Sequence, residues 1–167
     1  MSLKRVALCL LPVVAAGVVY GVLADASLPI ARFEFAGDAA TARELTAGRV
    51  EAFRDSLAAD YVFIAGYVAT LVLASLAGWP GRRLGIAGAA CAVGAGILDV
   101  VENVHLALGL SRWEDALFAR AALASGVKFA LVGAALVIGV TGLVRVARGR
   151  SRTPAVTERG TEGAGVR

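Results

Sequence analysis

The chain has 167 residues, of which 58% are hydrophobic, and its mean hydropathy is +0.74. Only 18% of the residues are charged, against about 25% in a typical soluble domain. This composition excludes an ordinary water-soluble domain. The net charge of +4 is compatible with nucleic-acid binding, but the basic residues are clustered at the ends of apolar stretches, so we expect no nucleic-acid partner.

Long apolar stretches predict the fold. A spanning helix needs about 20 mainly apolar residues to cross roughly 30 Å of hydrocarbon. The sequence has four such stretches, and it predicts an all-α, polytopic membrane four-helix bundle made by residues 1–146. The polar residues 147–167 are expected to form a disordered basic cytoplasmic tail. The predicted membrane helices cover residues 6–24, 61–79, 84–108 and 118–144.

The distribution of basic residues predicts the topology. Three basic clusters all lie on the cytoplasmic side if the N-terminus is cytoplasmic, as the positive-inside rule expects. Segments 25–60 and 107–120 then face outward and carry nine acidic and six basic residues. Both termini are therefore expected in the cytoplasm. The clusters are Lys4 and Arg5, Arg82 and Arg83, and Arg145, Arg148, Arg150 and Arg152.

The first apolar stretch, 6–24, has two interpretations. Its length exceeds the usual apolar region of a signal peptide, and Gly17 and Gly21 have the spacing that lets two helices approach closely, so we expect a retained helix. The alternative is a signal peptide cleaved near Ala24-Asp25-Ala26.

Residues 41–59 predict an additional amphipathic helix on the outer side, between the first two membrane helices. Leu45, Val50, Phe53 and Leu57 fall roughly on one face, with charged residues on the other. This helix is expected to lie on the membrane surface or to cover the entrance of the bundle. A plain surface connector is the alternative.

The second membrane helix begins with Asp60, which is either a helix N-cap or a group at the entrance of a site. Tyr67 lies seven residues on, about 10 Å deeper and on the same face. A phenol at that depth requires a hydrogen-bond partner.

The third membrane helix carries the most polar groups. Gly88, Ala92 and Gly96 recur every four residues, which predicts close packing against another helix. The same face continues to Asp99 and Asn103, so these side chains are expected to point into the bundle. Glu102 follows one turn after Asp99.

Depth along the helices places four groups in one layer of the membrane. At about 1.5 Å per residue, Tyr67, Asp99, Glu102 and Lys128 lie at similar levels in the outer half. A charge near the centre of a spanning helix costs about 2.5–3.5 kcal/mol. Since Lys128 neutralises only one carboxylate, we expect the other to hold a proton, bind a cation or reach water.

The sequence indicates no cofactor and no metal site. Glu102-x-x-His105 has the spacing found in di-iron bundles, but those sites need a second such pair and the chain has one histidine. The alternative is a single site formed by Asp99, Glu102 and His105, but an exposed interfacial imidazole is the simpler interpretation of His105. Cys9 and Cys91 lie in cytoplasmic halves of apolar helices, and we expect inert thiols.

Three motifs together resemble an uncharacterised group of small bacterial four-helix integral membrane proteins. They are Asp60-Tyr61-Val62-Phe63 with Tyr67, Leu98-Asp99-x-x-Glu102-Asn103, and a lysine in the last helix. Phe33-Glu34-Phe35-Ala36-Gly37 also fits, and the similarity covers roughly residues 30–130. The resemblance implies the fold and the key positions, and it implies no activity.

These patterns predict a multi-pass protein of the bacterial inner membrane, in contact with lipids. The preferred function is an outward-facing site for a small amphipathic molecule, a lipid headgroup or an ion, with a carboxylate that exchanges a proton. One alternative is a membrane-embedded enzyme acting on a lipid, and another is a structural subunit whose ion pairs only hold the bundle together. The candidate site residues are Asp60, Tyr67, Asp99, Glu102, Asn103 and Lys128.

Overall fold

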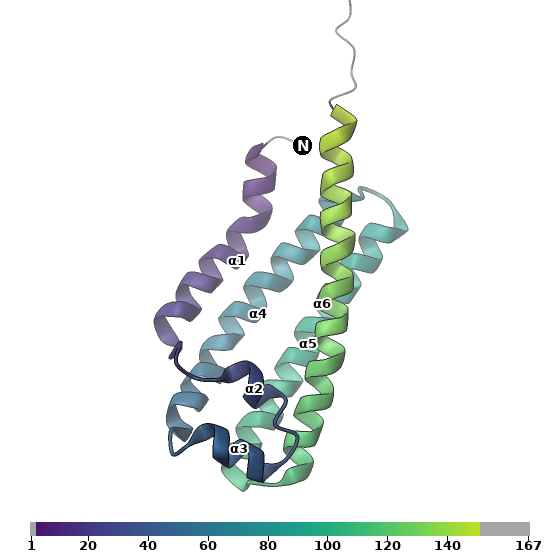
Figure 1. The fold of residues 1–167 in the computed structure, drawn as a ribbon. Helices are drawn as coiled ribbons and strands as arrows, with labels where there is room; N and C mark the ends of the chain where they lie inside the picture. Colours follow the sequence, from purple (N-terminus) through teal and green to yellow (C-terminus); the bar gives the residue numbers. More distant parts are fainter. Residues whose placement is uncertain (1–2, 151–167) are drawn as a thin grey trace, which may run out of the picture.

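The computed structural model describes residues 3–150, and side-chain surroundings for residues 8–148. This part of the chain is helical and contains no strand, which confirms the all-α prediction (Figure 1). The helices are α1 (Leu3–Leu23), α2 (Ile30–Glu34), α3 (Ala39–Thr46), α4 (Val50–Gly78), α5 (Arg83–Arg112) and α6 (Asp115–Arg150).

Three helices, α4, α5 and α6, are long and apolar enough to cross a membrane. The described apolar part of α1, Leu8–Leu23, is shorter. The fold is therefore that of a membrane protein with three long apolar helices, and a fourth spanning helix stays a prediction. Of the predicted tail, residues 147–150 belong to α6, and the remainder lies outside the described residues.

Helices α4, α5 and α6 pack against one another, whereas α1 packs mainly on α4. In Figure 1, α1 and α6 flank α4. The small-residue stripe of α5 packs as predicted. A Cβ atom added to Gly96 would lie 2.6 Å from Val68 of α4, and one added to Gly88 would lie 2.8 Å from Ile138 of α6. Ala92 between them is fully buried.

The contact between α1 and α4 depends on a different glycine from the predicted pair. Among the described residues, no atom beyond the adjacent backbone of α1 lies within 4 Å of a Cβ added to Gly17 or Gly21. Gly66 of α4 instead faces Pro12 and Ala16, and a Cβ added there would lie 2.7 Å from the Pro12 carbonyl oxygen. The sequence spacing in α1 was misleading because helix contact requires a small residue on the facing surface, which here belongs to α4.

Gly66→Ala is expected to lower the free energy of unfolding by about 1–3 kcal/mol, because the added methyl group cannot fit without separating α1 from α4. Gly17→Ala makes the same chemical change in open space and should cause no loss. Unfolding in mixed detergent micelles, followed by circular dichroism, compares the two. Equal losses in both variants would contradict this contact.

Residues 25–60 do not contain the single helix predicted for 41–59. Helix α3 ends at Thr46, because Ala47 and Gly48 have left-handed backbone angles, with φ of +44° and +80°. Helix α4 then begins at Val50 and continues through Asp60. The N-cap interpretation of Asp60 is therefore wrong: Leu57-Ala58-Ala59 before it contains no helix-breaking residue, and the helix passes straight through.

The segment between α1 and α4 forms a cap packed on one end of the bundle. Phe33 of α2 is fully buried, with its ring centroid 4.7 Å from Phe53 and 6.1 Å from Phe118. Leu106 and Leu110 of α5 belong to the same apolar cluster. The Asp38 side chain accepts a hydrogen bond of 2.8 Å from the Thr41 N–H and so caps α3, and this bond lowers the pKa of Asp38. The cap thereby has a fixed position over α5 and α6.

Candidate functional site: a buried carboxylate–lysine cluster

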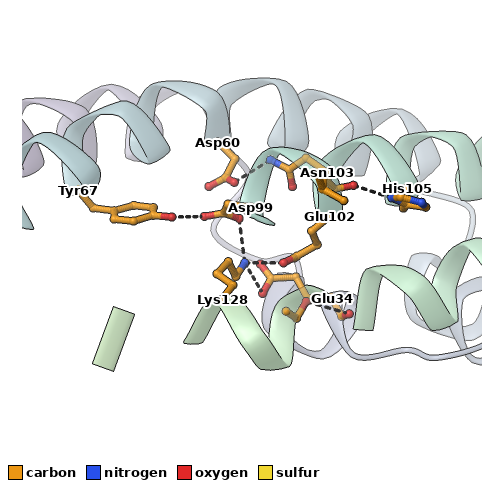
Figure 2. Close-up of polar contacts among 10 residues, drawn as sticks. Glu34, Asp60, Tyr67, Asp99, Glu102, Asn103, His105 and Lys128 are labelled. Atoms are coloured by element: carbon orange, nitrogen blue, oxygen red, sulfur yellow. Dashed lines mark hydrogen bonds and ion pairs between the residues drawn. The ribbon is translucent and has the colours of Figure 1, made fainter. Parts of the chain in front are cut away.

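Lys128 of α6 lies at the centre of a buried ionic cluster (Figure 2). Its Nζ atom is 2.7 Å from Glu102 Oε2, 2.8 Å from Asp99 Oδ1 and 3.5 Å from Glu34 Oε2. The exposed fractions of these side chains are 6% for Lys128, 0% for Glu102, 7% for Asp99 and 16% for Glu34. One ammonium group thus joins α2, α5 and α6. We call these four residues the carboxylate–lysine cluster.

The sequence of α5 explains why two of the carboxylates meet the same lysine. Asp99 and Glu102 are three residues apart and therefore share one helix face. Gly88 and Gly96 lie on the same side of α5 and pack closely against α6 and α4, so this side of the helix faces the bundle interior. Tyr67 of α4 donates a hydrogen bond of 2.8 Å from its hydroxyl to Asp99 Oδ2, which satisfies the second oxygen of that carboxylate. The phenol therefore has the partner that its depth required.

Asp60 and Asn103 form a second contact beside the cluster. The Asn103 side chain donates a hydrogen bond of 2.9 Å from Nδ2 to Asp60 Oδ2, which links α5 to α4. All six candidate residues thus lie in one region of the bundle, with Asp60 separated from Lys128 by Asp99 (Figure 2).

His105 does not belong to this region. Its Nδ1 atom lies 2.7 Å from the Val101 carbonyl oxygen of its own helix, away from the lysine (Figure 2). Over the part of the chain that the structure describes, no group of three or more His, Cys, Asp or Glu residues is arranged to hold a metal ion. The hypothetical site of Asp99, Glu102 and His105 is therefore not formed.

Glu34 is the member that the sequence analysis missed as a site residue. It is the last residue of α2, in the segment between α1 and α4, and the buried side chain of Phe33 beside it helps to place it at Lys128. Burial raises the pKa of Glu34, and the Lys128 ammonium opposes that rise. The available signal was the resemblance, since Phe33-Glu34-Phe35 was among the segments that fit it.

The cluster region contains more acidic than basic groups. Glu34, Asp60, Asp99 and Glu102 are four carboxyl groups, whereas Lys128 is the cation that contacts three of them. The Glu102 Oε1 atom is buried without a hydrogen-bond partner among the described residues. Buried carboxylates in this number require protons or additional cations, because an uncompensated buried charge is costly.

A cavity of about 400 Å³ adjoins the cluster between α1, α4 and α6. Its polar end is formed by Glu34, Asp60, Tyr67, Asp99 and Lys128. The remainder of its wall is apolar except for Thr70. That part is lined by Leu10 and Val13 of α1, Phe63, Thr70 and Leu71 of α4, and Phe129, Val132 and Leu136 of α6.

The fold and site define an all-helical membrane protein with buried ion pairs next to a cavity that is polar at one end. Comparisons with protein-family models, curated proteins and solved structures found no match. The resemblance to small bacterial four-helix proteins stays a prediction, and the geometry of the site is the basis for its function.

Proposed function

We propose that this protein binds a small amphipathic molecule within the membrane. The polar group of that molecule would contact the carboxylate–lysine cluster, and its apolar part would occupy the cavity between α1, α4 and α6. The observation that carries the proposal is this cavity, because a single continuous space of about 400 Å³ joins a group of ionisable side chains to a mainly apolar wall. Ligand pockets are typically apolar cavities of about 300–1,000 Å³ with a few convergent polar groups.

The position of the cavity supports entry from the lipid phase. The cap covers the end of the bundle, where its Phe33 packs against Phe53 and Phe118, and all three side chains are fully buried. By contrast, Leu10, Phe129 and Leu136 line the cavity and are also exposed on the apolar surface of the helices. A molecule with an apolar chain could therefore reach the cluster sideways between α1 and α6.

We further propose the bacterial inner membrane as the location, with both termini cytoplasmic. The turn between α4 and α5 and the C-terminal end of α6 lie at the end of the bundle opposite α2 and α3 (Figure 1). Arg145 supports this placement, since its guanidinium lies 5.0 Å from the ring centroid of Trp79. Two of the basic clusters thus share one end, which the positive-inside rule assigns to the cytoplasm.

Filling the cavity tests the proposed function. Leu136→Trp should reduce the amount of amphiphile that copurifies with the protein by about tenfold, equivalent to about 1.4 kcal/mol of binding free energy. Val137→Trp is the matched control, because Val137 is the next residue of α6, is 63% exposed and does not line the cavity. Mass spectrometry of lipid extracts from equal amounts of purified protein measures the retained molecule.

A structural role for the cluster is the second candidate, because Lys128 joins three helices directly. Such networks can specify which helices pair, although this depends on the protein. A purely structural cluster would retain no amphiphile in the cavity. The Leu136→Trp and Val137→Trp proteins would then have the same lipid content as the unaltered protein, which would contradict the binding function.

A further inference from the structure

We infer that the polar group of the bound amphiphile is a cation, specifically an ammonium group, which is held at the cavity beside Asp60. This inference rests on the proposed function and adds the chemical class of the ligand. The carboxylates, the aromatic rings and the hydrogen-bond acceptors around the cavity each support it.

The charges around the cavity favour a cationic ligand. Three carboxyl groups, Glu34, Asp60 and Asp99, line the cavity together with one basic group, Lys128. The lysine is already in contact with Asp99, Glu102 and Glu34. A phosphate headgroup would add negative charge to this excess, whereas an ammonium group would compensate it.

Carboxylate oxygens without a hydrogen-bond partner favour a ligand that donates hydrogen bonds. Glu34 Oε2 at the wall of the cavity and Glu102 Oε1 behind it in the cluster are both buried without a hydrogen-bond partner among the described residues. Asp60 accepts its hydrogen bond from Asn103 through Oδ2. An ammonium group carries only donors, so it matches a site rich in carboxylate acceptors.

The aromatic rings around the cavity also favour an ammonium group. Phe63 and Tyr67 line the cavity on the same helix as Asp60, with ring centroids 5.8 Å apart. On the opposite side, Phe129 lies with its ring centroid 4.8 Å from the Lys128 Nζ atom. Aromatic faces attract ammonium groups, and the attraction is larger where the site is desolvated. The Lys128 ammonium group is itself placed between carboxyl groups and an aromatic ring, so an ammonium group is compatible with these surroundings.

An organic cation fits these groups better than a bare metal ion. The carboxyl groups of the cluster and Asp60 come from three different helices and are separated by Lys128 and Asn103. They are therefore not arranged as a metal-ligand set in the described chain. The apolar wall of the cavity additionally requires a hydrocarbon portion, which a metal ion lacks.

The test compares three probes of equal chain length: dodecylamine, dodecyl phosphate and dodecanol. Each is titrated into the purified full-length protein reconstituted in phosphatidylcholine nanodiscs, and binding is measured by native mass spectrometry. Dodecylamine is expected to bind at least about tenfold more tightly than the other two, since a charge-assisted hydrogen bond contributes at least that ratio. Asp60→Asn should reduce this preference, whereas Asp55→Asn should not, because Asp55 lies exposed on α4 away from the cavity.

The outcomes separate the inference from the proposed function. A preference for dodecyl phosphate, equal binding of all three probes, or dodecylamine binding that does not change in Asp60→Asn would each overturn the cationic assignment while the cavity remains a binding site. If no probe binds, or if Leu136→Trp does not weaken binding, the proposed function itself fails. Circular dichroism checks that Asp60→Asn folds. If it does not fold, the order of affinities in the unaltered protein still decides the sign of the headgroup.

Discussion

Lys128→Met is expected to lower the free energy of unfolding by about 3–5 kcal/mol, because removing one partner from a buried ionic cluster leaves uncompensated charge. The lysine contacts three carboxyl groups, two of them within 2.8 Å, and both of these belong to α5. Methionine has a similar volume, so the loss reflects charge rather than packing. Unfolding in mixed micelles of a mild detergent and dodecyl sulfate, followed by circular dichroism, measures the difference.

Arg120→Met provides the matched control, since it removes a cation from an exposed position of the same helix. It should change stability by no more than about 0.5 kcal/mol. Adding Asp99→Asn and Glu102→Gln to Lys128→Met should recover most of the loss, because it removes the charges that the lysine compensates. A Lys128→Met protein as stable as the unaltered one would show that the carboxyl groups are neutral without the lysine.

Phe33→Ala is expected to lower the free energy of unfolding by about 3–5 kcal/mol, the range for truncating a fully buried phenylalanine. The ring packs between Phe53 of α4 and Phe118 of α6 and so attaches the cap to the bundle. Phe35→Ala is the control: Phe35 is half exposed and stacks on Phe129 at 5.9 Å, and its loss should be clearly smaller.

The same substitution tests how Glu34 reaches the cluster. If Phe33 positions Glu34, then Glu34→Gln should have little effect once Phe33 is alanine, and the two changes should not be additive. A double-mutant cycle from the same unfolding measurements gives the coupling between them. Full additivity would mean that the Glu34 contact forms independently of the cap.

Local pattern was sufficient to predict the arrangement within the long helices. The four-residue recurrence of Gly88, Ala92 and Gly96 has the same period on any straight helix, so the inward direction of Asp99 followed from the sequence. Rise per residue similarly placed Tyr67 and Lys128 at the level of Asp99. The structure joins them by hydrogen bonds of 2.8 Å.

Breaks in a helix depend on the backbone angles of single residues, and the sequence pattern did not predict them. The left-handed angles of Ala47 and Gly48 end α3, whereas the amphipathic pattern of 41–59 continues across them. Asp60 has the residue type of an N-cap, but its carboxylate bonds Asn103 instead, and α4 continues. Residue type alone did not distinguish these two uses of an aspartate.

The sequence by itself determined that this is an all-helical chain with long apolar helices and a polar layer facing inward, because hydrophobicity and helical period are local properties. Only the tertiary structure decided that Glu34 joins Lys128, that Gly66 rather than Gly17 brings α1 close, and that a cavity lies between α1, α4 and α6. Each of these depends on which surfaces of distant segments meet. Which surfaces meet depends on side-chain packing across the whole bundle, and a local sequence pattern does not specify that packing.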